Sequence, residues 1–342
     1  MIGEEAVLDA WVWGETPRVH QVRGGLINRT FIVSGQMGPL GVLQRLNTKV
    51  FGPEVHEDIE AVTRHLQARG LPTPLLQRTR DDGLWHAHHD GTIWRVLGWV
   101  GDRSIERAWS GTETAAAGAL VARFHAATAD LDWQFRSTRG GFHDTDSRMR
   151  QLQEVLSARP DHRLAKRVAP VADAILHAWQ LWDGPRDLPL RVVHGDLKTS
   201  NVRFQGSKAL ALIDLDTLGR GTLDAELGDA FRSWCNPALE DESARFDAEL
   251  FAEGIRGYAS EARGVTVAEW EAIVPGIERI ALELAARFAA DALEESYFGW
   301  DADRFPTRGH HNLARAQGQL DLALEVRGAR LAAEELVRAT RP

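Results

Sequence analysis

Cysteine is nearly absent from this chain of 342 residues, in which Cys235 is the only one. A single thiol excludes a disulfide within the chain and fits the reducing environment of the cytoplasm. Lone cysteines serve more often as small apolar core residues than as reactive groups, so Cys235 is expected to be buried. The cysteine content therefore predicts a cytoplasmic protein without a stabilising cross-link.

Long apolar runs are missing as well. No stretch approaches the roughly 18 apolar residues that a membrane span requires, and residues 1–5, Met-Ile-Gly-Glu-Glu, do not read as a signal peptide. The net charge of -9 argues against a nucleic acid as the main partner. We therefore expect neither membrane nor nucleic-acid binding, and a monomer or dimer whose partner is a small molecule.

The most informative stretch is polar and lies between two apolar runs. Residues 194–201 read His-Gly-Asp-Leu-Lys-Thr-Ser-Asn, and the apolar run 190–193 precedes them. A second apolar run, 210–213, leads directly to Asp214 and Asp216. Apolar runs of this length predict strands, and the polar residues between them predict a tight loop. The layout brings several oxygen-bearing side chains to one end of two neighbouring strands.

These side chains predict phosphoryl transfer. The reaction needs an aspartate that orients the acceptor hydroxyl, for which Asp196 is the candidate. It also needs oxygen ligands for Mg²⁺, which keeps several waters, so Asn201 and Asp214 are candidates and Asp216 supports a metal ion or the loop. Lys198 can neutralise the phosphoryl group in transit. The alternatives are a polar hairpin with a solvated acid pair and, for Lys198, an ordinary exposed lysine.

The same residues resemble the aminoglycoside phosphotransferase and choline kinase superfamily, whose members are relatives of the protein kinases. Further segments are similar to its N-acetylhexosamine 1-kinase-like branch, namely residues 25–31, 43–51, 141–145, 212–217, 228–232 and 311–316. The resemblance extends from about Gly24 to Leu320. It implies an α+β, bilobal protein-kinase-like fold with a small N-terminal antiparallel-sheet lobe and a larger, mainly helical C-terminal lobe. Residues 1–101 would form the nucleotide-binding lobe, and residues 102–342 would hold the catalytic loop, metal site and acceptor pocket.

A glycine pair and an asparagine precede two predicted strands, residues 30–33 and 41–44. Gly24 and Gly25 can form a flexible loop whose backbone N–H groups approach phosphates, although ordinary hairpin turns use the same residues. Asn28 either helps this loop to reach the nucleotide or stabilises a turn. We assign these three residues to the nucleotide site.

An amphipathic helix is predicted over residues 53–70. The resemblance implies that a glutamate on this helix pairs with a strand lysine that binds the α- and β-phosphates. Glu60 is the first candidate and Glu57 the second. The strand position, however, holds Gln44. Either Gln44 provides a neutral hydrogen bond, or a nearby basic group such as Arg45 or Lys49 supplies the charge. The alternative for Glu60 is a solvated side chain.

The hinge and the acceptor pocket follow from the resemblance. Residues 93–101 look like the last strand of the small lobe and the hinge, where backbone groups of Trp99 and Val100 would bind adenine. The acceptor pocket would lie between the catalytic loop and late helices, where Arg287 and Asp291 share one helix face. An exposed charge pair is the alternative for these two. The remaining candidates are Tyr297 for the acceptor and, as supports of the catalytic loop, His194, Asp229 and Arg232.

Three functions are consistent with these residues. The first is an ATP- and Mg²⁺-dependent kinase of a small sugar, most simply an N-acetylhexosamine, and twelve tryptophans give mild support to a carbohydrate acceptor. The second is a kinase of an aminoglycoside, homoserine or an amino alcohol. The third is a nucleotide-binding pseudokinase that regulates a partner, favoured only by the missing strand lysine.

Overall fold

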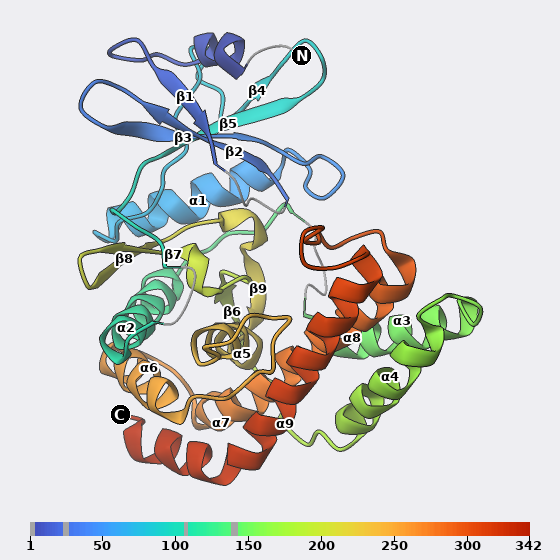
Figure 1. The fold of residues 1–342 in the computed structure, drawn as a ribbon. Coiled ribbons are helices and arrows are strands. Elements are labelled where there is room, and N and C mark those ends of the chain that lie inside the picture. The colour runs from blue at the N-terminus through green and yellow to red at the C-terminus, as the bar shows by residue number, and fades with distance from the viewer. Residues whose placement is uncertain (1–3, 23–26, 106–108, 138–142) are drawn as a thin grey trace.

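The computed structural model describes residues 4–22, 27–105, 109–137 and 143–342, with main chain only for residues 4–6. Gly24 and Gly25, which were predicted to approach the nucleotide, lie outside these ranges. Figure 1 shows a small upper part built around a sheet and a larger lower part built mainly from helices. The two parts match the α+β, two-lobed arrangement predicted from the sequence.

The upper lobe is a five-stranded antiparallel sheet in the order β1-β2-β3-β5-β4. Its strands are β1 (Arg18–Gln21), β2 (Arg29–Ser34), β3 (Pro39–Arg45), β4 (His86–Ala87) and β5 (Ile93–Gly98). Side chains alternate between the two faces of a strand, and Phe31, Leu43 and Val96 pack with Trp11 and the 3-10 helix η1 (Glu4–Ala10). The opposite face carries Gln44 and Arg95, which are directly paired in the β3–β5 register.

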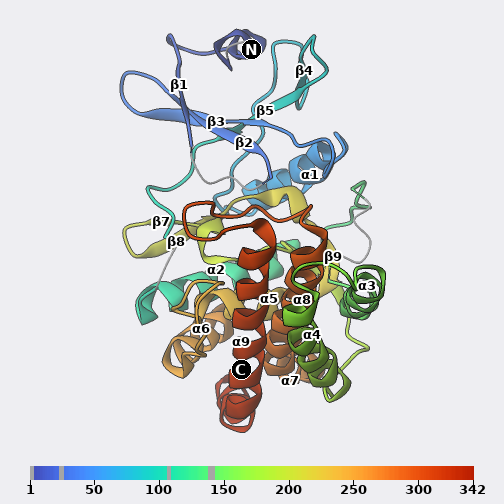
Figure 2. The same cartoon turned by 45° about the vertical axis from the view of Figure 1, so that its right-hand side comes forward.

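Helix α1 (Val55–Ala68) lies beneath the sheet, between it and the lower lobe (Figures 1 and 2). The predicted apolar stripe is buried as Val55, Ile59, Val62 and Leu66, so this prediction is confirmed. Asp58 is also buried, and its carboxylate accepts hydrogen bonds from Trp133 Nε1 and from the backbone N–H groups of residues 136 and 137, all at 2.8 Å. The helix is therefore fastened to the lower lobe as well as to the sheet.

The connection between the lobes runs from the end of β5 and is held on both sides. The backbone N–H of Gly98 donates to Leu75 O in the upper lobe at 2.8 Å. Arg203, in the lower lobe, donates from Nε to Val100 O at 2.9 Å and from an Nη to Gly101 O at 3.0 Å. Trp99 lies between these two anchors.

The lower lobe is formed by helices that surround two short strand pairs. Its helices are α2 (Gly111–Thr128), α3 (Thr145–Ala158), α4 (Ala165–Gln180), α5 (Leu223–Trp234), α6 (Ala248–Glu261), α7 (Val267–Glu271), α8 (Ile273–Glu294) and α9 (Arg308–Thr340). Glycines allow α5 and α8 to approach closely, because a Cβ at Gly276 would collide with the carbonyl of Asp224. The predicted buried position of Cys235 is confirmed at the end of α5.

The strand pairs form the upper surface of this lobe. Strand β6 (Leu190–Val193) pairs with β9 (Gly219–Thr222), and β7 (Val202–Gln205) pairs with β8 (Lys208–Leu212). Between them lie two single turns of 3-10 helix, η2 (Thr199–Asn201) and η3 (Leu215–Thr217). Figure 1 places these segments below α1 and above α5, at the junction of the lobes.

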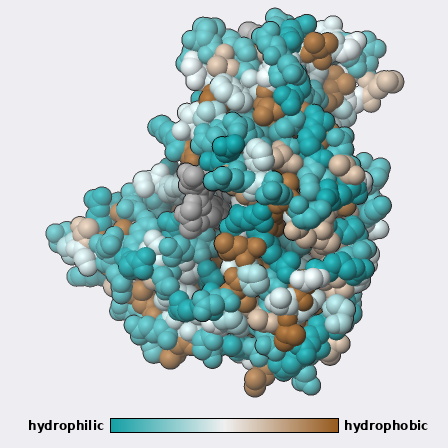
Figure 3. Space-filling view, turned by 180° about the vertical axis from the view of Figure 1, so that it is seen from behind, coloured by the Kyte–Doolittle hydropathy of each residue, from teal (hydrophilic) through white to brown (hydrophobic). Residues whose placement is uncertain are grey.

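The rear face is mostly hydrophilic, with small and separate hydrophobic patches (Figure 3). Within the described part of the chain, no helix combines the length and the apolar character that crossing a bilayer would need.

Candidate active site

The loop from His194 to Lys198 is shaped by two carboxylates of α5. Glu226 accepts backbone hydrogen bonds from His194 at 2.7 Å and Gly195 at 2.9 Å, and Asp229 accepts one from Leu197 at 2.7 Å. Gly195 has φ of +78°, and a Cβ there would lie 2.7 Å from the carbonyl oxygen of Thr217. This position therefore requires glycine.

His194 and Arg232 complete the support of the loop. His194 is buried, and its Nε2 donates to Ile213 O at 2.9 Å, which ties the loop to the end of β8. Arg232 donates to Asp229 at 2.9 Å and holds that carboxylate in place. His194, Asp229 and Arg232 thus lie where the sequence predicted them. Glu226 was missed, because nothing in the sequence distinguishes a buried glutamate three residues before Asp229.

Four polar side chains converge beside this loop. Lys198 Nζ lies 2.6 Å from Asp196 Oδ2 and 3.9 Å from Asp214 Oδ2. Asn201 Nδ2 donates to the carbonyl and to the carboxylate of Asp196, at 2.8 and 3.0 Å. Asp214 is 41% exposed, so its carboxylate is accessible from the junction of the lobes. The structure therefore brings Asp196, Lys198, Asn201 and Asp214 together.

The pKa values of the two aspartates in this group are shifted in opposite directions. Burial raises the pKa of Asp196, but the adjacent Lys198 ammonium more than compensates and holds that pKa below its ordinary value. Asp196 is therefore ionised at neutral pH. Desolvation raises the pKa of Asp214, Lys198 opposes the rise, and the carboxylates of Asp216 and Asp196 add to it. Asp214 thus bears an excess of negative charge that a cation would relieve.

This donor set fits a magnesium ion bound together with phosphates. Within the described residues no three His, Cys, Asp or Glu side chains converge as a metal cage. Mg²⁺ at a phosphate site needs only one or two carboxylates, since phosphate and water oxygens complete its shell. Asp214 has φ of 64° and ψ of 56°, a left-handed conformation that is costly for aspartate and is found at functional sites.

Comparison with known proteins identifies the family. The sequence profile of the phosphotransferase enzyme family (APH) matches residues 18–263. The chain belongs to this family. A homoserine kinase of Methylocella silvestris is 27% identical over 84% of each chain, and a homoserine kinase of Methylobacillus flagellatus is 24% identical over 83% of this chain and 82% of its own.

Solved structures show the same fold. An amicoumacin kinase superposes with a TM-score of 0.65 over 93% of each chain, at 16% identity. A microcompartment-associated aminopropanol kinase has a TM-score of 0.62, at 14% identity, over 97% of this chain and 98% of its own. The prediction of a bilobal, kinase-like phosphotransferase that acts on small molecules is confirmed. These matches do not test the resemblance to the N-acetylhexosamine branch, which stays a prediction.

The carboxylate of Asp216 is already paired within this phosphotransferase, unlike that of Asp214. Its carboxylate accepts from Arg95 through both oxygens, at 2.5 and 2.8 Å, and from Asn28 Nδ2 at 2.6 Å. A guanidinium in this position would repel a divalent cation. Of the two roles predicted for Asp216, the structure therefore favours support of the loop over binding of a metal ion, because its charge is already neutralised inside the protein. Asn28 likewise faces Asp216, and its Oδ1 accepts from the backbone N–H of Asn47 at 2.9 Å.

Glu60 is not the partner of a strand cation. Its carboxylate lies 3.0 Å from Arg64 Nε and 2.7 Å from Arg78 Nη2, so it is already paired with two other arginines. Gln44 instead accepts hydrogen bonds from Arg95, at 3.0 and 2.7 Å. The predicted nucleotide role of Glu60 is therefore wrong. The basic group that hydrogen-bonds to Gln44 therefore comes from β5.

The α1 residue that lies near Arg95 and Asp216 is His56 and not Glu60. His56 is fully buried, and its Nδ1 donates to Pro53 O at 2.7 Å. Burial and the positive charge of Arg95 lower the pKa of His56 to about 4, although the Pro53 hydrogen bond and Asp216 oppose this. The ring is therefore neutral at physiological pH.

This lowered pKa predicts a specific sensitivity to acid. As pH falls from 6.5 to about 4, the unfolded chain takes up a proton at His56 that the folded chain does not. The folded state then loses roughly 3 kcal/mol by the bottom of this window. His56→Gln should remove this part of the loss, so that its melting temperature depends less on pH than that of the wild type. The exposed His89→Gln is the control, and parallel curves for all three proteins would contradict the assignment.

The hinge candidates lie where the lobes connect. Trp99 is the residue between the two anchors of the connection, and the guanidinium of Arg203 lies 4.8 Å from its ring centroid. The carbonyl of Val100 accepts from Arg203, as described for the fold. Both residues remain candidates for adenine binding through their backbone groups.

The acceptor candidates differ in their exposure to solvent. Asp291 is 2% exposed, and its carboxylate accepts from the backbone N–H groups of residues 296, 297 and 298 and from Asn312. It shapes the loop between α8 and α9, so its predicted contact with the acceptor is wrong. Tyr297, by contrast, is 52% exposed, and the guanidinium of Arg287 lies 5.9 Å from its ring centroid. The α8–α9 loop lies at the top of the lower lobe, facing the upper lobe (Figures 1 and 2).

A buried pair next to Arg287 was missed from the sequence. His143 Nδ1 lies 3.0 Å from Glu283 Oε1, and Thr145 donates to the other oxygen of Glu283 at 2.7 Å. Burial lowers the pKa of His143, but Glu283 more than compensates, so this pKa lies above its ordinary value. Asp229 also raises it and Arg287 lowers it, which places the imidazole between α5 and α8.

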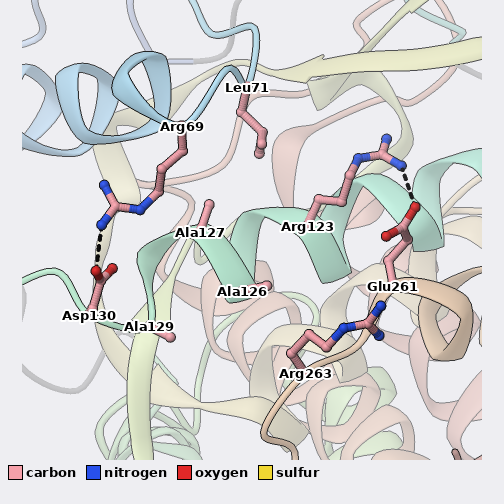
Figure 4. A pocket seen from close by; sticks show the side chains of 9 residues that line it. All are labelled: Arg69, Leu71, Arg123, Ala126, Ala127, Ala129, Asp130, Glu261 and Arg263. Atoms are coloured by element: carbon pink, nitrogen blue, oxygen red, sulfur yellow. Dashed lines mark hydrogen bonds and ion pairs between the residues drawn. The ribbon is translucent and has the colours of Figure 1, made fainter.

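A separate hollow of about 450 Å³ lies at the C-terminal ends of α1, α2 and α6 (Figure 4). It is bordered by two ion pairs, Arg69–Asp130 at 2.5 Å and Arg123–Glu261 at 3.4 Å. The catalytic residues do not line it. Arg69 and Arg123 are paired at the surface, where such contacts contribute little.

Proposed function

We propose that this phosphotransferase moves the γ-phosphoryl group of Mg²⁺–ATP to a hydroxyl group of a small acceptor at the junction of the lobes. The observation that carries the proposal is the convergence of Asp196, Lys198, Asn201 and Asp214 on one face of the catalytic loop. An aspartate with an asparagine five residues later and a second aspartate after the following strand pair are the parts that kinases use.

Each residue has a separate task in this mechanism. Asp196, ionised at neutral pH, accepts a hydrogen bond from the acceptor hydroxyl, orients its oxygen toward phosphorus and receives the proton as the new O–P bond forms. Lys198 balances negative charge beside the transferred group. Asn201 and Asp214 would hold the magnesium ion, which neutralises phosphate charge. The bond between the β–γ bridging oxygen and phosphorus breaks, and ADP leaves.

For the acceptor we propose a sugar, with an N-acetylhexosamine as the first candidate. The exposed ring of Tyr297 and the guanidinium of Arg287 offer an aromatic face beside a hydrogen-bond donor, a combination suited to a sugar ring and its hydroxyl groups. The segments that resemble the N-acetylhexosamine branch support the same choice.

Homoserine or an amino alcohol is the second candidate. It is favoured by the homoserine kinases that match most of this chain. At 24 to 27% identity the residues around the acceptor are free to differ, so these relatives leave the acceptor open.

A panel of acceptors tests the proposal. ATP consumption should be measured with N-acetylhexosamines, other hexoses, homoserine, amino alcohols and aminoglycosides. We expect the highest kcat/KM for a sugar. We also expect Tyr297→Ala to raise the KM for that sugar by roughly ten-fold while the KM for ATP stays unchanged. A preference for homoserine would overturn the sugar assignment, and tight ATP binding without turnover of any acceptor would overturn the mechanism.

A further inference from the structure

The nucleotide lobe lacks a lysine at the position of Gln44 on β3, but a cation lies directly beside it. Arg95 of β5 is paired with Gln44 across the antiparallel register. Its side chain is 1% exposed, so this guanidinium is buried between the sheet and the lower lobe. A buried arginine is unfavourable unless its charge and its donors are matched.

The guanidinium is matched by two residues from opposite lobes. Its Nη1 and Nη2 donate to Asp216 at 2.5 and 2.8 Å, a bidentate arrangement that fixes the direction of the carboxylate. Its Nε and Nη2 donate to Gln44 Oε1, and Gln44 Nε2 lies 3.2 Å from the hydroxyl of Thr30 on β2. Gln44 therefore holds the guanidinium from the sheet side.

Asp216 belongs to the same short turn as the metal-binding candidate. Helix η3 spans Leu215–Thr217, and Asp214 caps it in the left-handed conformation. The ion pair therefore fixes the turn immediately after Asp214. Because a strained residue keeps its conformation only when its surroundings hold it, Arg95 is in a position to maintain the orientation of the Asp214 carboxylate.

We propose that Arg95, oriented by Gln44, is a positioning residue that acts through Asp216 to hold Asp214 ready for the metal ion. The inference rests on the proposed function, in which Asp214 holds magnesium. In this arrangement Arg95 extends from β5 of the upper lobe, and Asp216 extends from η3 of the lower lobe. The pair takes the structural place of a strand lysine and a helix glutamate, because Glu60 is paired with Arg64 and Arg78 instead.

The pairing of Arg95 with Asp216 favours a positioning role for Arg95 over direct contact with phosphate. Arg95 and Asp216 neutralise each other, and the guanidinium is enclosed by the groups it contacts. A residue that grips phosphate would have to lose these buried contacts on binding. A residue that supports a metal ligand would keep them in every state, and such supports typically affect metal affinity by about 10- to 100-fold.

The test consists of two measurements. Electron paramagnetic resonance monitors the titration of the protein–ADP complex with Mn²⁺, and calorimetry gives the affinity for ADP without metal. Arg95→Lys keeps the charge but loses the bidentate geometry, and Gln44→Ala leaves the ion pair but removes its support. We expect both variants to weaken Mn²⁺ binding by about 10-fold or more, with metal-free ADP affinity changed less than about threefold. Asp216→Asn should behave like Arg95→Lys.

Two outcomes would overturn the proposal. Unchanged Mn²⁺ affinity in the Arg95→Lys and Gln44→Ala variants would exclude a positioning role. If the variants lose as much affinity for metal-free ADP as they lose for Mn²⁺, Arg95 acts on the nucleotide directly. The control is Arg78→Met, which removes a surface ion pair with Glu60 on the same lobe and should leave both affinities within about twofold.

The same measurements separate this inference from the proposed function. If the wild-type protein transfers phosphate to no acceptor, the proposed function fails, whereas metal binding to the ADP complex still reports on Arg95. If transfer occurs and the variants bind Mn²⁺ as the wild type does, only the positioning role fails.

Discussion

Replacing Asp196 by asparagine is expected to lower kcat by about 10³-fold, within the range found for removal of a catalytic base. Asparagine has nearly the same shape as aspartate but cannot receive the proton of the acceptor hydroxyl. The ionised state of Asp196 is maintained by Lys198 at 2.6 Å, so the wild-type carboxylate is ready to accept that proton at neutral pH. ATP affinity should change little, because the loss affects the acceptor side of the reaction.

A coupled assay of ADP release gives kcat, and calorimetry gives the affinity for ATP. Asp161→Asn, in the exposed segment between α3 and α4, is the matched control and should retain wild-type turnover. If Asp196→Asn, shown to be folded by its melting curve, keeps more than a tenth of wild-type kcat, the assigned role is wrong.

Asp214→Asn is expected to have opposite effects on activity and stability. Loss of this carboxylate removes a ligand of the metal ion and should lower kcat by about 10²- to 10³-fold. The pKa of Asp214 is raised in the folded state, mainly by desolvation. The folded chain therefore binds more protons than the unfolded chain above the ordinary carboxyl pKa, and its stability falls as pH rises through that window. At neutral pH the ionised group thus destabilises the fold, and its removal should raise the melting temperature.

Melting curves with and without Mg²⁺–ADP distinguish this explanation from simple damage. Without metal, Asp214→Asn should melt above the wild type. With Mg²⁺–ADP, the wild type should gain more stability than the variant, because only the wild type has the full ligand set. A variant that melts lower under both conditions would contradict the electrostatic explanation, and one with wild-type kcat would contradict the metal assignment.

The catalytic loop was predictable because its parts are close together in the sequence. Asp196 and Asn201 lie within one loop, and the apolar runs on either side specify the strands that carry it. The apolar stripe of α1 was predictable for a similar reason, since a period of 3.6 residues is a local property. In both cases short-range patterns determine which side chains share a face.

The errors arose where the folded chain, and not the local sequence pattern, decides which groups a side chain meets. Arg95 and Asp216 are separated by 121 positions, and neither residue carries a local sign that they meet. Asp291 shares a helical face with Arg287, but the period does not reveal which face meets the core. Its burial and its hydrogen bonds to the following loop became visible only in the folded structure.

The arrangement of the interlobe connection has a mechanical consequence. Gly98 is bonded to the upper lobe and Val100 to Arg203 below it, so the torsion angles of Trp99 have to absorb most of any relative rotation. The two backbone torsion angles of one residue permit a limited rotation of the lobes, and the bonds of Asp58 on α1 to the lower lobe restrict it further. Because the bidentate Arg95–Asp216 pair also joins the two lobes, a rotation that keeps this pair would move η3 together with the upper lobe, so the rotation and the orientation of the metal ligand would change in step.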